Sequence, residues 1–550
     1  MVELEVKCGD WGQPSTSQPL TWMCPEGHVF RYRRRPLLTS CFFIFCFFLM
    51  ERGALYVLKT VLNMHLERTL GLSASAPCLG YMMISVFFGV YDSSPILIAS
   101  ISDTYLGAYK SIVIFGFVFV FGLSLITLVG GSWFEQALGP TWCAMVALLG
   151  LVAVSAGGLG PCLTAFGGSQ FHPYVQTAGG SRFFSFIFAS TSVGALLGIG
   201  TALVVYQSHP FRYLLLLAAI LGVVGWLAFL VGSLFYVKRC VHTNSVKRMW
   251  HAAWACLSRF SFDLVVKPEQ EGGNFSESEI EDVRIVARLV PIFACLIPLY
   301  LGQVQVLTTL RTMGLKLARP RSFGIHSYLP AEILLVFEPA TALLLSLFLN
   351  YLLYPALQKR QRMPSHLGRL MAGGGLVFVG FLASFAIQKF LMAAESETLV
   401  FETYSIFILV GPVVLFSAGQ SLITSSGFEL SYAYAPESMW SVSISLFSVI
   451  YALGSLLSLL LFYLAKPWLD SPTESLLETR SLSSTDDPQI SIRLDVYFAI
   501  AAALCLLSLI GLTCLRGFHG RTRAMRIERD VEKRALQIAL KRNIRTTSFL

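Results

Sequence analysis

The sequence predicts an all-α membrane protein of twelve transmembrane helices, arranged as two halves of six. Three observations lead to this fold class. The chain of 550 residues is 55% hydrophobic and 13% charged and contains 42 phenylalanines, more apolar side chains than a soluble core needs. About twelve apolar runs approach the ~20 residues that a helix needs to cross a bilayer. A long polar connection separates the first six runs from the last six.

Polar or charged residues bound each apolar run and set its limits to within a few residues. The predicted spans are residues 38–60, 80–101, 111–131, 141–165, 183–206, 212–237, 286–310, 329–354, 367–391, 404–430, 439–465 and 494–515. The predicted organisation is a cytosolic segment 1–37, a first half 38–237, a cytosolic connection 238–284, a second half 285–515 and a basic cytosolic tail 516–550. Two halves of this kind are typical of a secondary transporter.

Basic residues set the predicted orientation, because lysine and arginine resist translocation. Arg33, Arg34 and Arg35 stand directly before the first span, so the N-terminus is expected in the cytosol, and the C-terminus with it. The loop 311–328 opposes this rule, because it is basic and the count of spans places it outside. The lipid bilayer is the expected environment. The plasma membrane and an endolysosomal membrane both remain open, as does the oligomeric state.

Catalytic and cofactor motifs are missing from the sequence. No nucleophile–base constellation or phosphate-binding loop stands in an aqueous segment, so an enzyme is not expected. The twelve cysteines show no metal-ligand spacing, and neither a metal nor a nucleic-acid partner is expected. The nine histidines fall at or beyond the ends of the spans. A coupling proton, the one ion that we expect, would therefore be carried by a carboxylate.

Ionisable residues inside the apolar spans are functional candidates, because a charge in hydrocarbon is costly. Glu51, Arg52 and Lys59 lie in the first span. Adjacent side chains point about 100° apart on a helix, so Glu51 and Arg52 are not expected to neutralise each other. Each is expected to have a partner on another helix or in a water-filled cavity. A structural ion-pair network that closes the first half is an equal alternative.

Three further carboxylates lie in or near the spans. Asp92 precedes Ser93 and Pro95, and it either serves function or caps a break in the helix. Glu332 lies near the outer end of the eighth span and is expected to reach water. Glu338 lies ~9 Å deeper and is the better candidate for binding a proton, because a low-dielectric environment disfavours a charged carboxylate.

Three motifs resemble known transporters. The stretch SDTYLGAYKSI, residues 102–112, resembles the loop between helices two and three of major facilitator transporters, through Asp103, Gly107 and Lys110. SAGGLGPCLTAFGGSQF, followed by RFFSFIFASTSVGALL, and later SSGFELSYAYAPESMWSV resemble the proton-coupled oligopeptide transporters of solute carrier family 15. The resemblance covers nearly all the spans. It implies the major facilitator fold, and inward proton movement that drives uptake of di- and tripeptides through an alternating central cavity.

The residues that this resemblance assigns to the site are only partly kept. The first-helix motif retains Glu51, Arg52 and Tyr56, and Glu429 of the last motif is also kept. Five positions differ: Phe48 replaces a glutamate, Gly160 the fourth-helix lysine, Phe188 and Ser192 the helix-five tyrosine and asparagine, and Gln420 the tenth-helix glutamate that receives the peptide ammonium. Losing both charged poles would weaken a zwitterion by ~3 kcal/mol or more.

The sequence therefore predicts a substrate site in which Arg52 is the one cation left to hold a carboxylate. The predicted substrate-binding residues are Arg52, Tyr56, Phe188, Ser192 and Gln420. The candidate proton carriers are Glu51 and Glu338, and the candidate gating residues are Asp103, Gly107, Lys110, Arg288 and Glu429. Arg288 is either a gate or a cytosolic anchor. The alternatives to a proton-coupled carrier of peptide-like solutes are an uncoupled facilitator and a receptor or scaffold without transport.

Overall fold

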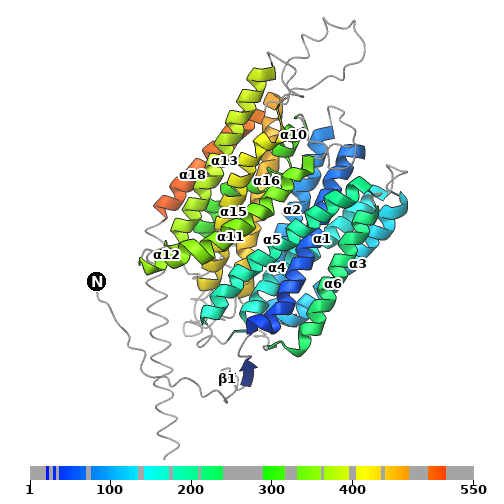
Figure 1. The fold of residues 1–550 in the computed structure, drawn as a ribbon, viewed down its shortest axis with the longest axis vertical. Helices are drawn as coiled ribbons and strands as arrows, with labels where there is room; N and C mark the ends of the chain where they lie inside the picture. Colours follow the sequence, from blue (N-terminus) through cyan, green and yellow to red (C-terminus); the bar gives the residue numbers. More distant parts are fainter. Residues whose placement is uncertain are drawn as a thin grey trace, which may run out of the picture.

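The computed structural model describes fourteen stretches of the chain. These are residues 20–23, 29–32, 36–69, 76–133, 141–171, 177–208, 212–238, 289–315, 317, 331–360, 364–395, 404–434, 440–469 and 494–515. Two helical bundles lie side by side, one coloured blue to green and the other green to red (Figure 1). A short antiparallel ribbon, β1 (Leu20–Met23) and β2 (Val29–Tyr32), precedes them. The predicted connection 238–284 lies outside the described residues beyond Lys238, and the tail 516–550 lies outside them entirely.

The first bundle follows the first six predicted spans. Its helices are α1 (Ser40–Thr69), α2 (Ala76–Ile101), α3 (Ala108–Trp133), α4 (Thr141–Gly168), α5 (Thr177–Ser208) and α6 (Arg212–Val231), with short turns η1 (Pro36–Leu38), η2 (Ser102–Leu106) and η3 (Gly232–Leu234). The glycines of α4 allow close packing. A Cβ on Gly157 would lie 1.9 Å from the carbonyl oxygen of Tyr91 on α2, so only glycine fits there.

The second bundle contains the remaining spans, with breaks in two of them. Its elements are α9 (Val290–Leu296), η5 (Ile297–Gln303), α10 (Thr309–Leu315), η6 (Ala331–Ile333), α11 (Leu334–Leu347), η7 (Phe348–Leu353), α12 (Tyr354–Lys359), α13 (His366–Glu395), η8 (Ile406–Leu409), α15 (Val410–Tyr434), α16 (Trp440–Leu469) and α18 (Leu494–Cys514). The prediction of one helix over 286–310 is wrong. Pro298 has no N–H to continue the α-helical ladder, and the chain tightens into η5.

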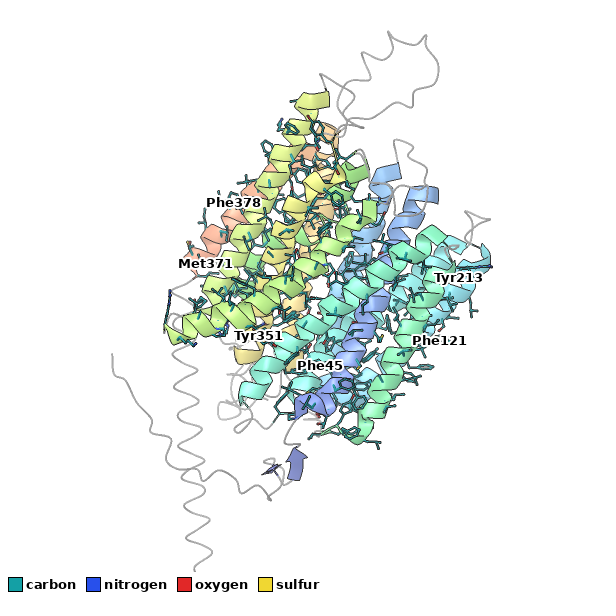
Figure 2. All side chains as sticks on the ribbon, viewed as in Figure 1. Phe45, Phe121, Tyr213, Tyr351, Met371 and Phe378 are labelled. Atoms are coloured by element: carbon teal, nitrogen blue, oxygen red, sulfur yellow. The ribbon has the colours of Figure 1, made fainter. Side chains whose placement is uncertain are left out.

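The outer surface of both bundles is apolar, as a lipid environment requires. Ten helices among the described residues are long and apolar enough to cross a membrane, and two shorter apolar segments, Ser85–Ile101 and Val290–Gln303, accompany them. Side chains project outward all around the bundles in Figure 2. Exposed apolar residues include Leu128, Leu216, Leu344 and Leu507. The chain is a multi-pass membrane protein.

Arg311 and Glu332 form an ion pair that the sequence did not predict. Glu332 was expected to reach water, but it is buried, and its Oε1 accepts a hydrogen bond from Arg311 Nε at 2.7 Å. The prediction for Glu332 is wrong, because the arginine of α10 folds back onto η6. Arg311, which opposed the orientation rule, is thus a structural partner of Glu332 and no longer counts as a free loop charge.

Candidate substrate cavity between the two halves

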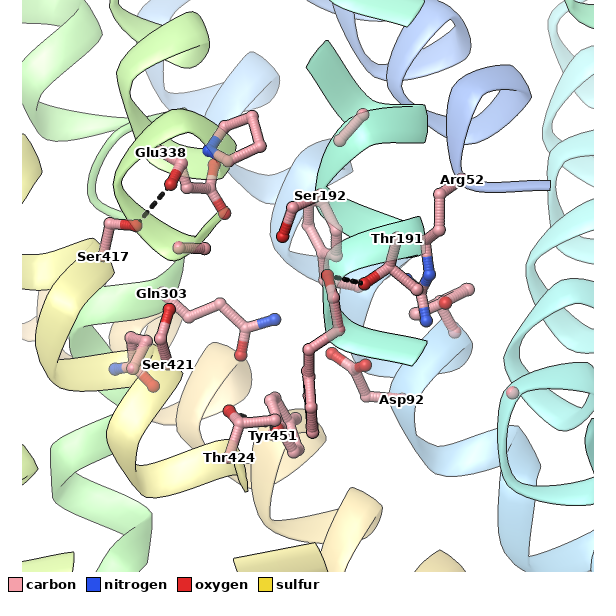
Figure 3. Close-up of a pocket in the computed structure, with 18 of the residues that line it drawn as sticks. Arg52, Asp92, Thr191, Ser192, Gln303, Glu338, Ser417, Ser421, Thr424 and Tyr451 are labelled. Carbon is pink, nitrogen blue, oxygen red and sulfur yellow. Dashed lines mark hydrogen bonds between the residues drawn. The ribbon is translucent and has the colours of Figure 1, made fainter. Parts of the chain in front are cut away.

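A cavity of ≈ 260 Å³ lies between the two bundles. It is lined from both halves, by α1, α2, α4 and α5 on one side and by η5, α11, α15 and α16 on the other (Figure 3). Pairs of helices close it laterally, since α2 packs along α16 and α5 along α11. Four ionisable lining residues, all within the described part of the chain, are Arg52, Lys59, Asp92 and Glu338.

Helical spacing brings the first-half residues to one face. Arg52, Tyr56 and Lys59 are separated by four and three residues on α1, so all three side chains point into the cavity. On α2, Asp92 and Pro95 follow the same rule. Once one residue of a helix is known to face the cavity, the sequence spacing therefore identifies the others on that face.

Arg52 lies closer to Glu51 than the sequence predicted. Its Nε is 3.4 Å from Glu51 Oε2, and Glu51 is only 1% exposed. The expectation that Glu51 and Arg52 do not neutralise each other is therefore wrong, because the two side chains approach within ion-pair distance. The Arg52 guanidinium also lies 5.8 Å from the centre of the Tyr91 ring on α2. A Cβ on Gly160 would meet only Arg52 Nη2, at 3.7 Å, so the position where the resemblance places a lysine is open space beside this cation.

Lys59 is a second cation in the cavity. Its Nζ lies 4.1 Å from the centre of the Tyr56 ring and 4.5 Å from that of Phe88. No carboxylate of the described residues approaches it closely enough for an ion pair. The prediction that Arg52 is the sole remaining cation is therefore wrong. The sequence placed Lys59 in the first span but could not show that it faces the same cavity as Arg52.

Two carboxylates also face the cavity. Glu338 Oε1 accepts a hydrogen bond from the Tyr56 hydroxyl at 3.2 Å, which connects α1 of one half to α11 of the other. The Ser417 hydroxyl donates to the Glu338 backbone carbonyl (Figure 3). Asp92 is 7% exposed, and its Oδ2 has no hydrogen-bond donor among the described residues. Lys59 and Arg52 act on Asp92 electrostatically without forming a close ion pair.

The other predicted substrate-binding residues also line the cavity. Ser192 on α5 is buried at its wall. The Phe188 ring of α5 stacks on Phe428 of α15, with 6.1 Å between centroids, and so connects the two halves. Gln420 donates from Nε2 to the backbone carbonyl of Leu299 at 2.8 Å, and its Oε1 has no donor among the described residues.

Of the predicted gating residues, Gly107, Lys110 and Glu429 do not line this cavity. Gly107 follows η2 and has a φ of 78°, a conformation that favours glycine. Its N–H donates to the carbonyl of Ser102, the first residue of η2. Lys110 is exposed on α3. Glu429 is 49% exposed and pairs at 2.7 Å with Arg369 instead of facing the cavity. The side chain of Asp103 and all of Arg288 lie outside what the structure describes.

Sequence reasoning missed several polar residues of the cavity. Gln303 projects into it from η5, and Tyr451 of α16 donates a hydrogen bond to Thr424 of α15 at 2.6 Å (Figure 3). A glutamine within an apolar run was a usable signal for Gln303. Thr424 and Tyr451 gave none, because hydroxyl residues are common in membrane helices and their spacing does not show that these two meet across α15 and α16.

Two helical halves around a polar central cavity define the class of this molecule as a secondary membrane transporter. The sequence profile of the POT family (PTR2) matches residues 109–470, more than half of the chain. The chain belongs to the POT family, which is a family of transporters and not of enzymes.

Individual relatives agree with this assignment. The chain is 23% identical to solute carrier family 15 member 3 of Rattus norvegicus over 436 residues, which cover 72% of each chain. It is 25% identical to peptide transporter family 2 of Caenorhabditis elegans over 422 residues, 69% of this chain and 50% of that one. The crystal structure of the POT family transporter PepTSo superimposes with a TM-score of 0.65 at 18% identity, covering 88% of this chain and 98% of that one. That likeness shows the major facilitator fold.

Proposed function

We propose that the protein carries small peptides or peptide-like carboxylate solutes by alternating access, and that a proton moves with them. The observation that carries this proposal is the cavity between the halves, which presents two cations and two carboxylates. Such a cavity can orient a zwitterion, since each charged end finds an opposite charge in a low-dielectric site. Family membership supports the same function. Related crystal structures hold alafosfalin, a thioalcohol-conjugated peptide and 5-aminolevulinic acid.

Arg52 is the proposed carboxylate anchor, and Lys59 supports it. Arg52 offers a fork of N–H donors that matches a carboxylate. Tyr56, Phe188, Ser192 and Gln420 shape the remainder of the proposed site.

Glu51 and Glu338 are the proposed proton carriers. With all groups ionised, the cavity holds Arg52, Lys59, Asp92 and Glu338, and Glu51 lies beside Arg52, so the group of five has one negative charge in excess. One proton would balance it, and a zwitterion would then add no net charge. Tyr56 connects Glu338 to the helix that carries Arg52, so protonation of Glu338 would change a contact between the halves. This contact supports coupling between protonation and the movement of the halves.

Uptake of labelled alanyl-alanine into liposomes, with and without an inward proton gradient, tests this function. We expect uptake to depend on the gradient. Arg52→Ala should lower it roughly 100-fold, because a charge-assisted hydrogen-bonded pair contributes ~1.5–3 kcal/mol. Arg52→Lys should retain part of it. Ser93→Ala is the control, since Ser93 bonds to the Val90 carbonyl of its own helix and does not line the cavity.

Two other outcomes would contradict the proposal. Uptake that is independent of the gradient would indicate an uncoupled facilitator. Failure to take up alanyl-alanine or any related solute, by a correctly folded protein, would indicate a receptor or scaffold. The termini are proposed to be cytosolic, and protease accessibility of tags at either end of the chain in sealed vesicles tests this orientation.

A further inference from the structure

Three buried side-chain oxygens at the cavity have no hydrogen-bond donor among the described residues. They belong to Asp92 (Oδ2), Gln303 (Oε1) and Gln420 (Oε1). The orientation of the Gln420 amide is fixed, because its nitrogen donates to the Leu299 carbonyl and a flipped amide would set two oxygens face to face. A buried acceptor without a donor is unfavourable. Each of these oxygens can accept a hydrogen bond from an N–H group of a bound solute.

Asp92 is the carboxylate of the cavity that is most available for a cation. Glu338 already accepts a hydrogen bond from Tyr56. Glu51 lies 3.4 Å from Arg52 Nε and does not line the cavity. Asp92 is more than nine-tenths buried, projects into the cavity and has no ion-pair partner among the described residues.

The position of Asp92 suits an ammonium group of the solute whose carboxylate binds Arg52. Figure 3 shows Asp92 and Arg52 on one side of the cavity and Gln303 and Glu338 on the other. Asp92 comes from α2 and Arg52 from α1, so both charged poles belong to the first half. Gln303 and Gln420 of the second half would contribute neutral oxygens to the same ammonium.

We propose that Asp92 binds the ammonium group of the transported solute, with the amide oxygens of Gln303 and Gln420 as neutral acceptors. This inference rests on the proposed function and deepens it. The resemblance assigns the ammonium to a glutamate at position 420, where this chain has glutamine. The carboxylate that binds the ammonium is therefore on the second span in this chain, whereas the resemblance places it on the tenth. The preferred substrate class is a small solute with a free primary ammonium, and blocking that ammonium removes the preference.

Competition binding to the full-length protein in lipid nanodiscs tests the inference. The probes are alanyl-alanine, which has a free ammonium, and N-acetyl-alanyl-alanine, which has none. The wild type should prefer alanyl-alanine. Asp92→Asn should weaken alanyl-alanine about tenfold or more and leave the acetylated probe unchanged, because only a charged partner is lost. Gln420→Ala should weaken alanyl-alanine less, and Ser93→Ala should change neither affinity. Equal weakening of both probes, or an unchanged ratio in Asp92→Asn, would overturn the inference.

A second measurement does not depend on peptide binding. Ser192→Cys and Thr191→Cys place a thiol at the cavity wall. Two methanethiosulfonate reagents are used, one with a cationic trimethylammonium group and one with an anionic sulfonate group. Mass spectrometry measures the rate at which each reagent modifies these two positions. The cationic reagent should react faster, and adding Asp92→Asn should lower the rate ratio several-fold. An unchanged ratio would overturn the inference, as would absence of reaction at both positions. If Asp92→Asn lowers the rate ratio but the protein binds no dipeptide, Asp92 is still the negative charge of the cavity. That result would contradict the proposed peptide substrate and not this inference.

Discussion

The two halves of the molecule treat their buried charges differently. In the second half, Glu338 faces the cavity, but six other charged residues form close pairs away from it: Arg311 with Glu332 at 2.7 Å, Arg369 with Glu429 at 2.7 Å and Lys389 with Asp495 at 2.6 Å. In the first half, Arg52, Lys59 and Asp92 face the cavity, and Arg52 alone has an ion partner within 4 Å among the described residues. An ion pair within the protein, here called a closed pair, holds helices in place. A charged side chain that faces the cavity without such a close pair, here called an open charge, remains available to a solute.

The first span of each half also differs in its backbone, which is continuous in one half and broken in the other. Helix α1 is continuous over Ser40–Thr69, and its cavity face carries the charges. Its counterpart breaks into α9, η5 and α10, and the carbonyls at the break accept hydrogen bonds from side chains of α15 and α18. These bonds join Gln420 to Leu299, Ser508 to Cys295 and Cys505 to Pro298. The break is therefore fixed within the second half.

The largest expected effect is on the closed pair. Arg311→Met would leave Glu332 buried without its cation, and loss of one member of a buried pair destabilises by about 3–5 kcal/mol. We expect a large fall in melting temperature, measured by thermal unfolding in detergent. The double variant Arg311→Met with Glu332→Leu should recover most of this loss, because no charge is stranded. An unchanged melting temperature in the single variant would show that the second half does not depend on its pairs.

The matched substitution in the first half should have the opposite pattern. Lys59→Met removes a half-buried cation that has no ion partner among the described residues, so the melting temperature should not fall. Uptake of alanyl-alanine should fall roughly 10- to 100-fold, because a charged partner of the solute contributes ~1.5–3 kcal/mol. A fall in melting temperature like that of Arg311→Met would remove the distinction between open and closed charges.

The contact between the halves should show a smaller effect. Tyr56→Phe removes the hydroxyl that donates to Glu338 and leaves the ring beside Lys59. Uptake should fall about three- to tenfold, because a single hydrogen bond contributes ~0.5–1.5 kcal/mol. Initial rates over a range of alanyl-alanine concentrations would measure it. A variant with wild-type rates would mean that the Tyr56–Glu338 contact does not affect transport.

The smallest effect is expected at Gly160. Gly160→Ala adds a methyl group whose nearest neighbour is Arg52 Nη2 at 3.7 Å, an ordinary contact. Uptake should change by no more than about twofold, because no group has to move. Gly150→Ala, on the same helix with nothing within 4 Å, is the control. A much larger loss at Gly160 alone would indicate that the solute or the guanidinium occupies this space.

Sequence reasoning recovered the transmembrane architecture and part of the site. The apolar runs identified the helices because a lipid environment imposes length and hydropathy on each span separately. The first-helix motif of the resemblance identified Arg52 and Tyr56, and the depth of Glu338 in its span identified it as a candidate. These are properties of single helices. The proposed roles of the site residues stay predictions.

Only the tertiary structure decided which charges are paired and which face the cavity. Glu332 and Arg311 are 21 positions apart and belong to different elements, so no helical periodicity connects them. Lys59 and Asp92 belong to different helices, and their common orientation depends on how α1 and α2 rotate against each other. The carbonyls at the break near Pro298 accept hydrogen bonds from residues more than a hundred positions away. Electrostatic partnership depends on distance in space, which hydropathy along a chain does not encode.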